Sequence, residues 1–395
     1  MSAADGPSHA GDGTPLDLRP EAERERRLER EASVDRGLLA RLPKAELHCH
    51  LDGSVRPATL LELGAEYGVA MPAPDPEALA RYMRVDDARN LEDYLARFDV
   101  TLSVMQTEAA LERIAYELAV DAAAEGVRYL EARYAPVLNT RGGLAFGATV
   151  EAPLRGLARA ERETGIVARV IVCGIRNMAP ETSLELARLA VEYRRAGVVG
   201  FDLAGGEAGF PASLHQAAFD HARGHDLACT CHAGEGAGPE SVRDALHVCG
   251  ADRLGHATRL IEDPSLTDYV NDRRICCECC LTSNVQTRAT SSYDTHPFRR
   301  YFDLGLNVVL NTDNRLMSGT TLVDEYAHAM AHLGFTPAEL ARVARNGFES
   351  AFLPYEERRA LLARVDGELA ALLAGANGRA GEAPAAAAAP DGALA

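Results

Sequence analysis

Two histidines and an aspartate are spaced two residues apart in the segment His48-Cys49-His50-Leu51-Asp52. Side chains alternate between the two faces of a strand, so His48, His50 and Asp52 point to one side. Two imidazoles placed in this way can chelate one divalent ion. The alternative is a pair of hydrogen-bonded structural histidines, which Asp52 makes less attractive because an inward charge is costly without a partner.

Three later segments carry groups of the same kind. His232 ends an apolar run and Glu235 follows it on a Gly-rich turn, while His256 and Asp313 end two further runs. Three histidine nitrogens and one aspartate oxygen suit a first-row metal, with zinc favoured by the ligand types. A catalytic metal site also needs an open position for water and a further His or Glu to handle its proton. Taken alone, His256 is more simply interpreted as a satisfied strand-end histidine and Asp313 as a helix cap.

Eight short apolar runs, separated mostly by helix-period segments, can supply the strands that position these groups. The runs are 45–51, 127–133, 168–174, 198–203, 227–232, 253–256, 275–281 and 307–312. Strands that alternate with helices favour an α/β fold with a single (β/α)8 TIM-type barrel, whose catalytic groups lie at the C-terminal strand ends. An open doubly wound sheet is the alternative, but no G-x-G-x-x-G follows the first run. The long segment 53–126 predicts an extended helical insertion after the first strand.

The ordered set of motifs resembles the adenosine deaminases of the metal-dependent amidohydrolase superfamily. The matching segments occur in family order and cover about residues 43–372: PKAELHCHLDGS (43–54), FDLAGGE (201–207), HAGE (232–235), RLGHAT (253–258), LTSNVQT (281–287) and LNTDN (310–314). The resemblance implies one Zn²⁺ per chain and a purine nucleoside as substrate. It implies hydrolytic deamination of adenosine and 2′-deoxyadenosine to inosine or deoxyinosine and ammonia, in purine salvage.

The resemblance also implies roles for individual residues. The implied zinc ligands are His48, His50, His232 and Asp313. Glu235 is similar to the family acid that protonates ring nitrogen 1 of the purine. His256 is similar to the residue that orients the attacking water and helps to deprotonate it.

Four residues are expected to contact the substrate: His50, Asp52, Gly205 and Asn314. The resemblance implies that Asp52 binds the ribose 5′-hydroxyl and that the backbone amide of Gly205 meets ring nitrogen 3. Most family members carry Asp-Asp where this chain has Asp313-Asn314. Ring nitrogen 7 is an acceptor and needs a donor, which an Asn amide supplies and an ionised carboxylate does not. Asn314 is therefore compatible with a purine, and the exact substrate preference stays open.

These residues are compatible with three functions. The first is deamination of adenosine with zinc. The second keeps the chemistry but changes the substrate, for example to aminodeoxyfutalosine or adenine; Asp52 favours a free 5′-hydroxyl over a 5′-phosphate because like charges repel. The third is a catalytically silent, nucleoside-binding paralogue, and the presence of every implied ligand and of Glu235 argues against it.

Other reactive residue types are interpreted as structural. CCECC at 276–280 contains C-x-x-C twice but predicts a buried seventh strand that uses Cys as a small hydrophobe. Apolar side chains at helical spacing within 53–126 predict core packing, with a gate over the pocket as the alternative: Leu91, Tyr94, Leu95, Phe98 and Leu102. Seven further histidines are predicted on the surface or in packing: His215, His221, His225, His247, His296, His328 and His332.

Charge and composition limit the class of protein. The 395 residues hold 41 Lys+Arg and 58 Asp+Glu, a net charge of −17, which argues against nucleic acid or an anionic membrane as the main partner. An odd count of nine cysteines favours reduced thiols in a cytoplasmic protein, and the sequence predicts no membrane span or secretory signal. The expected organisation is a flexible or partly helical tail at 1–37, a deaminase barrel at 38–372 and a disordered Ala/Gly/Pro-rich tail at 373–395.

Overall fold

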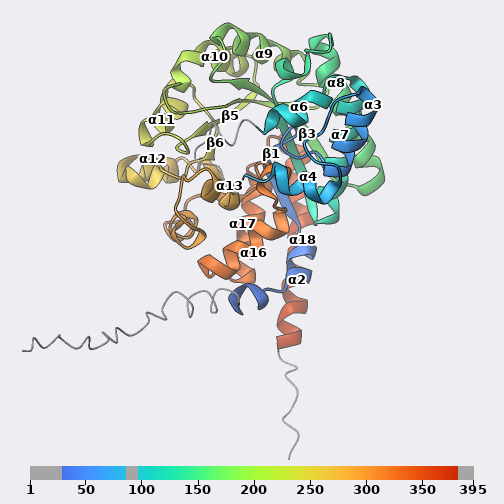
Figure 1. Cartoon of the computed structure of the whole chain (residues 1–395). Helices are drawn as coiled ribbons and strands as arrows, with labels where there is room; N and C mark the ends of the chain where they lie inside the picture. The colour runs from blue at the N-terminus through green and yellow to red at the C-terminus, as the bar shows by residue number, and fades with distance from the viewer. Residues whose placement is uncertain (1–28, 86–96, 381–395) are drawn as a thin grey trace, which may run out of the picture.

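Eight parallel strands form a nearly closed barrel in the computed structural model, which describes residues 29–85 and 97–380 (Figure 1). The strands pair in chain order: β1 (Lys44–His50), β2 (Val127–Tyr134), β3 (Val167–Ile175), β4 (Val198–Ala204), β5 (Ala228–Ala233), β6 (Arg253–His256), β7 (Cys276–Cys279) and β8 (Val308–Leu310). Between the first and last strands, the N–H of His50 donates to the carbonyl of Asp313 at 2.7 Å, and the N–H of Asp313 donates to the carbonyl of His48 at 2.9 Å. The predicted α/β class and (β/α)8 architecture are confirmed.

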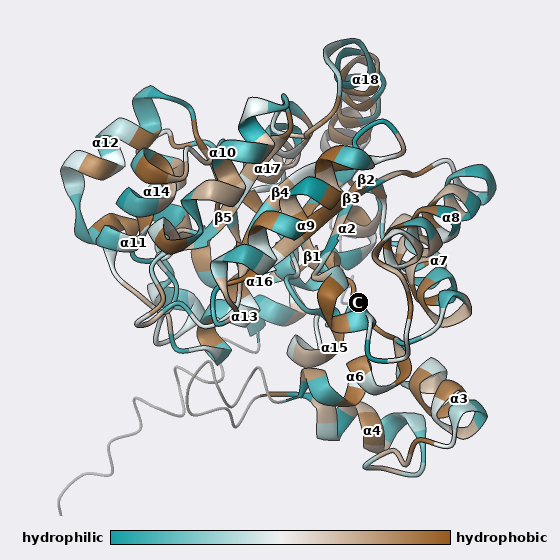
Figure 2. Cartoon of the chain, turned by 90° about the horizontal axis from the view of Figure 1, so that it is seen from above, coloured by the Kyte–Doolittle hydropathy of each residue, from teal (hydrophilic) through white to brown (hydrophobic). Residues whose placement is uncertain are grey.

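Helices surround the strands (Figure 1). They are α2 (Arg36–Arg41), α3 (Pro57–Tyr67), α4 (Pro76–Met83), α6 (Phe98–Val104), α7 (Glu108–Ala124), α8 (Phe146–Thr164), α9 (Pro180–Glu192), α10 (Gln216–Gly224), α11 (Pro239–Arg243), α12 (Pro264–Asp272), α13 (Leu281–Gln286), α14 (Phe298–Asp303), α15 (Arg315–Ser318), α16 (Leu322–Leu333), α17 (Pro337–Glu349) and α18 (Tyr355–Ala380). Figure 2 shows hydrophilic and hydrophobic residues alternating along many of them, as expected for helices that pack one face on a barrel.

The insertion after β1 contains α3, α4, α6 and α7, which confirms the predicted helical insertion. Helix α3 contacts both α4 and α6, and the three gather at one side of the barrel in Figure 2. The side chain of Thr107 accepts from the backbone N–H of Ala110 at 3.1 Å and so caps the start of α7. Leu91, Tyr94 and Leu95 lie outside the described residues.

Two strands are shorter than their apolar runs. Strand β7 ends at Cys279 because Leu281 already begins α13, and β8 ends at Leu310 before the backbone bridge to β1. The CCECC run is nevertheless a buried strand, as predicted, and all nine cysteines are free and buried. Burial raises the pKa of the Cys276 thiol to about 12, so this thiol stays protonated and unreactive near neutrality.

The chain is anchored to the barrel at both ends of its described part. The buried Nζ of Lys44 in β1 donates to the carbonyls of Leu39 at 2.6 Å and Leu42 at 2.7 Å, which ties α2 to the first strand. At the other end, Leu361, Val365 and Leu369 of α18 are buried in the hydrophobic core. Helix α18 continues to Ala380, so the boundary expected at 372 falls inside it. In residues 29–85 and 97–380, no helix is both long and apolar enough to span a bilayer.

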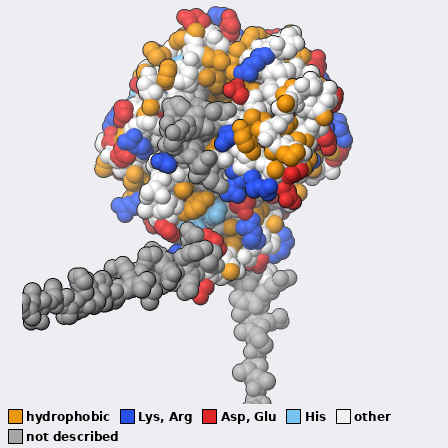
Figure 3. Space-filling model, viewed as in Figure 1, with side chains coloured by type: hydrophobic (Ala, Val, Ile, Leu, Met, Phe, Trp, Pro, Cys, Tyr) orange, Lys and Arg blue, Asp and Glu red, His pale blue; other side chains and the backbone are white. Residues whose placement is uncertain are grey.

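Charged side chains of both signs are interspersed over the face seen in Figure 3. Some of them link neighbouring helices through ion pairs. Arg155 of α8, for example, lies 2.9 Å from Glu108 and 2.8 Å from Glu112 of α7. Exposed pairs of this kind are each worth about 0–1 kcal/mol, so they contribute little to stability compared with the buried core.

Candidate metal centre and active site

The four implied metal ligands converge at the C-terminal ends of β1 and β5 and just beyond β8. One ligand atom from each of them lies within 4.8 Å of the others: His48, His50, His232 and Asp313. Nε2 of His50 lies 3.1 Å from Nε2 of His232. Oδ1 of Asp313 lies 3.4 Å from Nε2 of both His48 and His50. The structure therefore brings the four residues named from the sequence together at one place.

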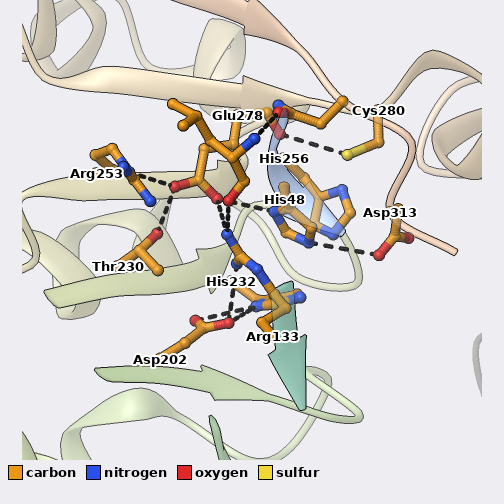
Figure 4. A network of polar contacts seen from close by, with 12 residues as sticks. His48, Arg133, Asp202, Thr230, His232, Arg253, His256, Glu278, Cys280 and Asp313 are labelled. Atoms are coloured by element: carbon orange, nitrogen blue, oxygen red, sulfur yellow. Dashed lines mark hydrogen bonds and ion pairs between the residues drawn. The ribbon is translucent and has the colours of Figure 1, made fainter. Parts of the chain in front are cut away.

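Two carboxylates hold the outer nitrogens of the histidine rings (Figure 4). Nδ1 of His48 lies 2.9 Å from Oε2 of Glu278, and Nδ1 of His232 lies 3.1 Å from Oδ2 of Asp202. A carboxylate can only accept, so each Nδ1 donates and each Nε2 lone pair faces the centre. Nε2 of His48 is buried and makes no hydrogen bond with any described residue. This inward lone pair lies beside the ligand atoms of the other three residues. Together the four atoms could coordinate a divalent metal ion.

Two arginines fill the barrel beneath the site and fix these carboxylates. Arg133 donates to Asp202 at 2.9 Å and to Glu278 at 2.8 Å. The other oxygen of Glu278 accepts from Arg253 at 2.7 Å and from Thr230 at 2.9 Å. Burial alone would raise the pKa of Glu278, but Arg133 and Arg253 hold it well below its usual range. Glu278 therefore stays ionised and orients His48.

The protonation states of two ligands, His48 and Asp313, also suit metal binding, whereas the Asp202 carboxylate raises the pKa of His232 against the effect of burial. Burial, with the charges of Arg133 and His232, lowers the pKa of His48 to about 4, so its ring is neutral near pH 7. Burial opposes ionisation of Asp313, but its contact with His48 holds the pKa of this carboxyl well below its usual range. Ser283 donates to Oδ2 of Asp313 at 2.6 Å and orients it. Neutral imidazoles and an ionised carboxylate are the forms that ligate metals.

Glu235 sits on the turn after β5, and one carboxylate holds that turn. Glu207 accepts from the backbone N–H groups of Gly234 at 2.7 Å, Glu235 at 2.9 Å, Gly236 at 2.6 Å and Ala237 at 3.1 Å. Gly234 has φ of +75°, which favours glycine. Glu207 thus connects the FDLAGGE and HAGE segments and positions the Glu235 side chain.

The side chain of Glu235 points towards His256. Oε2 of Glu235 lies 3.5 Å from Nε2 of His256, and Oε1 accepts from Thr287 at 2.9 Å. Burial raises the pKa of Glu235 above its ordinary value, so its protonated form persists to higher pH.

His256 and Asp313 have φ of +62° and +59°, in a region that non-glycine residues seldom adopt. Such backbone strain is typical of functional sites, where the surrounding structure holds it in place.

The expected substrate-contacting residues line one cavity of about 230 Å³ that also reaches the metal ligands. They are His50, Asp52, Gly205 and Asn314. Asp52 is buried, and burial raises its pKa to about 7. Phe98 and Leu102 of α6 line the same cavity, so this part of the insertion forms a wall of the pocket.

Close backbone approach explains two glycines at the cavity. A Cβ on Gly53 would lie 1.8 Å from Oδ1 of Asn314, so the absence of a side chain there gives Asn314 its place. Gly205 has φ of +93°, and a Cβ on it would lie 2.9 Å from Oδ1 of Asn177. Asn177 in turn accepts from the N–H of Gly206 at 2.8 Å.

Several residues of the site had no role assigned from the sequence. Arg133 lies in the run 127–133, Glu207 in the FDLAGGE segment and Glu278 in CCECC. An acid within a buried run such as CCECC is itself a signal of an inward partner. Asp202 lies in the apolar run 198–203 and in the FDLAGGE segment. His296, predicted as a surface or packing residue, is buried but also bonds to Asn284, which bonds to His256.

Comparison with known proteins matches residues 43–368 to the adenosine deaminase family. The adenosine deaminase of Mycobacterium sp. (strain JLS) is 41% identical over 355 residues, which cover 85% of this chain and 98% of that protein. The probable adenosine deaminase of Dictyostelium discoideum is 42% identical over 327 residues, which cover 82% of this chain but 42% of that protein.

Solved structures agree with this assignment. A cog1816 amidohydrolase from Burkholderia ambifaria with bound Zn has a TM-score of 0.78 and 28% identity, over 88% of this chain and 95% of that one. Arabidopsis ADAL complexed with IMP has a TM-score of 0.74 and 31% identity, over 83% of this chain and 97% of that one. The family match covers most of the chain, and the histidine–aspartate metal site agrees with it. This chain therefore belongs to the adenosine deaminase family, a group of hydrolytic deaminases within the amidohydrolase superfamily.

Proposed function

We propose that this chain is a cytoplasmic, zinc-dependent enzyme that converts adenosine and 2′-deoxyadenosine, with water, into inosine or deoxyinosine and ammonia, in purine salvage. The observation that carries the proposal is the meeting of the metal cluster and the buried Glu235 in one cavity. The adenosine deaminases that are about 41% identical to the chain support adenosine as the substrate.

Zinc is proposed at the four-residue cluster, one ion per chain. The buried, unbonded Nε2 of His48 and the carboxylate partners of His48 and His232 support this assignment. A zinc ion held there would supply Lewis-acid activation of a water molecule. The residues of the chain then have to bind the purine, orient the nucleophile and protonate the ring.

Glu235 is proposed to protonate ring nitrogen 1. Attack on carbon 6 requires that electron density move into the ring, and protonation of nitrogen 1 gives that density a place to go. A buried carboxyl with a raised pKa is suited to this task because its protonated form persists to higher pH than that of an ordinary glutamate. His256, 3.5 Å away, is proposed to orient the oxygen that attacks.

The rest of the cavity is proposed to bind the nucleoside. Asp52 would accept from the 5′-hydroxyl, the backbone N–H of Gly205 would donate to ring nitrogen 3, and the Asn314 amide would donate to ring nitrogen 7. All three residues line the cavity. An ultraviolet assay with adenosine, 2′-deoxyadenosine, adenine, AMP and aminodeoxyfutalosine tests the substrate. The proposal expects the two nucleosides to have the highest kcat/KM, and a clear preference for any of the other three would contradict it.

Replacing Asp52 with alanine is expected to weaken use of adenosine by about 10- to 150-fold in kcat/KM, the cost of one hydrogen bond to a charged group. The same variant should lose far less on 5′-deoxyadenosine, which lacks the hydroxyl. Steady-state kinetics on both substrates, with metal content measured in parallel, make the comparison. Equal losses on the two substrates would show that Asp52 supports His50, 4.0 Å away, rather than the sugar.

Replacing Asn314 with leucine is expected to remove most of the discrimination between adenosine and 7-deazaadenosine. In the wild type, the analogue leaves a buried Asn314 amide unpaired, which costs about 1–3 kcal/mol, or roughly 5- to 150-fold. The leucine variant has no donor to leave unpaired.

The double-mutant cycle is the proper readout, because the deaza ring also differs electronically. The ratio of kcat/KM for the two substrates should fall towards the intrinsic electronic ratio in the leucine variant. An unchanged ratio would mean that Asn314 does not contact ring nitrogen 7.

A further inference from the structure

A chain of buried hydrogen bonds leads from the backbone to the inner side of His256. The N–H of Phe298 donates to Nδ1 of His296 at 3.1 Å. Nε2 of His296 lies 3.1 Å from Oδ1 of Asn284, and Nδ2 of Asn284 lies 3.0 Å from Nδ1 of His256. The three linked side chains are 0–3% exposed, so water does not compete for these bonds.

The direction of the chain is set at its outer end. A backbone N–H can only donate, so Nδ1 of His296 must hold a lone pair. Burial lowers the pKa of His296 to about 3, so the ring is neutral. A neutral imidazole with a bare Nδ1 carries its hydrogen on Nε2. His296 therefore donates to Asn284.

The donation from His296 fixes the amide of Asn284. An amide oxygen accepts and an amide nitrogen donates, so Oδ1 must face His296 and Nδ2 must face His256. The reversed amide would place donor against donor at His296 in a buried site. Nδ2 then donates to Nδ1 of His256, which must be the bare nitrogen of that ring. When the His256 ring carries a single hydrogen, that hydrogen therefore lies on Nε2, the nitrogen next to Glu235.

We propose that Asn284 and His296 are positioning residues that lock His256 in the tautomer with hydrogen on Nε2. His256 lines the cavity, and its Nε2 makes no hydrogen bond with any described residue. In this tautomer the ring offers a donor to the attacking oxygen. Hydrogen bonding to a charged form favours that form, so the donor helps the nucleophile to ionise. The catalytic consequence rests on the proposed deaminase function, whereas the tautomer does not.

The direct test is ¹⁵N NMR of the histidine rings in the zinc-loaded full chain, because protonated and bare ring nitrogens give distinct signals. A His256→Gln variant assigns the signals of His256. The wild type should show a protonated Nε2 and a bare Nδ1. Asn284→Asp should move the hydrogen of His256 to Nδ1, because a carboxylate accepts from both rings. A proton on Nδ1 in the wild type would overturn the proposal.

Kinetics of matched variants test the role of the tautomer. Asn284→Asp should lower kcat by about 10²- to 10⁴-fold, the range for misplaced proton-handling groups, with zinc content unchanged and KM within about threefold. His296→Leu removes the donor to Asn284 and should give mixed tautomers and a reduced kcat. His296→Gln keeps a donor near the position of Nε2. This variant should therefore retain most of the wild-type tautomer of His256 and most of the wild-type kcat.

The outcomes separate the two proposals. If His256 shows the expected tautomer but the chain does not deaminate adenosine, the positioning is upheld and the proposed function fails. If His296→Leu matches the wild type in ring signals and kcat, His296 is not part of the positioning. If Asn284→Asp changes kcat but not the tautomer, the proposed cause is wrong.

Discussion

Glu235→Gln is expected to lower kcat on adenosine by about 10²- to 10⁴-fold while leaving the metal in place. Glutamine has nearly the same shape and can still accept from Thr287, but it cannot deliver a proton to ring nitrogen 1. Steady-state kinetics and metal analysis of the same preparation make the test. A glutamine variant within about threefold of wild-type turnover would give this role to another residue.

The pH profile supplies a second readout for the same residue. Burial raises the pKa of Glu235, so the required protonated form is fully present below that pKa and is lost as pH rises through it. In the wild type, kcat/KM should therefore fall on the alkaline side. The residual activity of Glu235→Gln should lack this limb, because its side chain does not titrate. Glu356→Gln, on the exposed start of α18, is the matched control and should keep the wild-type profile.

Metal affinity is expected to collapse in His48→Ala and Asp313→Ala, since each variant removes one ligand atom from the cluster. Asp202→Asn keeps all four ligands but weakens the partner of His232, and should lose about 10- to 100-fold in metal affinity. Competition with a chromophoric chelator measures the whole series. The order of losses is the prediction: the ligand variants should lose more than Asp202→Asn, and Glu356→Gln should lose nothing. An unchanged metal affinity in His48→Ala would show that this cluster does not bind the metal.

The strand-end residues could be predicted because their spacing has few explanations. His48 and His50 lie two residues apart at the end of an apolar run, and the runs alternate with helical segments, so a barrel brings the strand ends together. The same reasoning applies to His232 and Asp313. Nε2 of His232 lies 3.1 Å from Nε2 of His50, and Oδ1 of Asp313 lies 3.4 Å from the same nitrogen. Local pattern and topology placed these groups at one end of a barrel, and the family resemblance selected the four ligands among them.

The residues behind the ligands could not be predicted, because their partners depend on the register between strands. Arg133 of β2 reaches Asp202 of β4 and Glu278 of β7, and no local pattern links these three positions. In the sequence, Arg133 is only the last residue of an apolar run, and Glu278 is only one residue of a cysteine-rich strand. His296 illustrates the same limit, because its role depends on the backbone N–H of Phe298 and on Asn284.

The most direct measurement is a zinc titration of the metal-free full chain, with inosine and ammonia quantified from adenosine at each step. Activity should rise in proportion to zinc and reach its plateau at one ion per chain, with equal amounts of inosine and ammonia formed. Full activity in a verified metal-free preparation, or no inosine from the chain loaded with one zinc, would contradict the account.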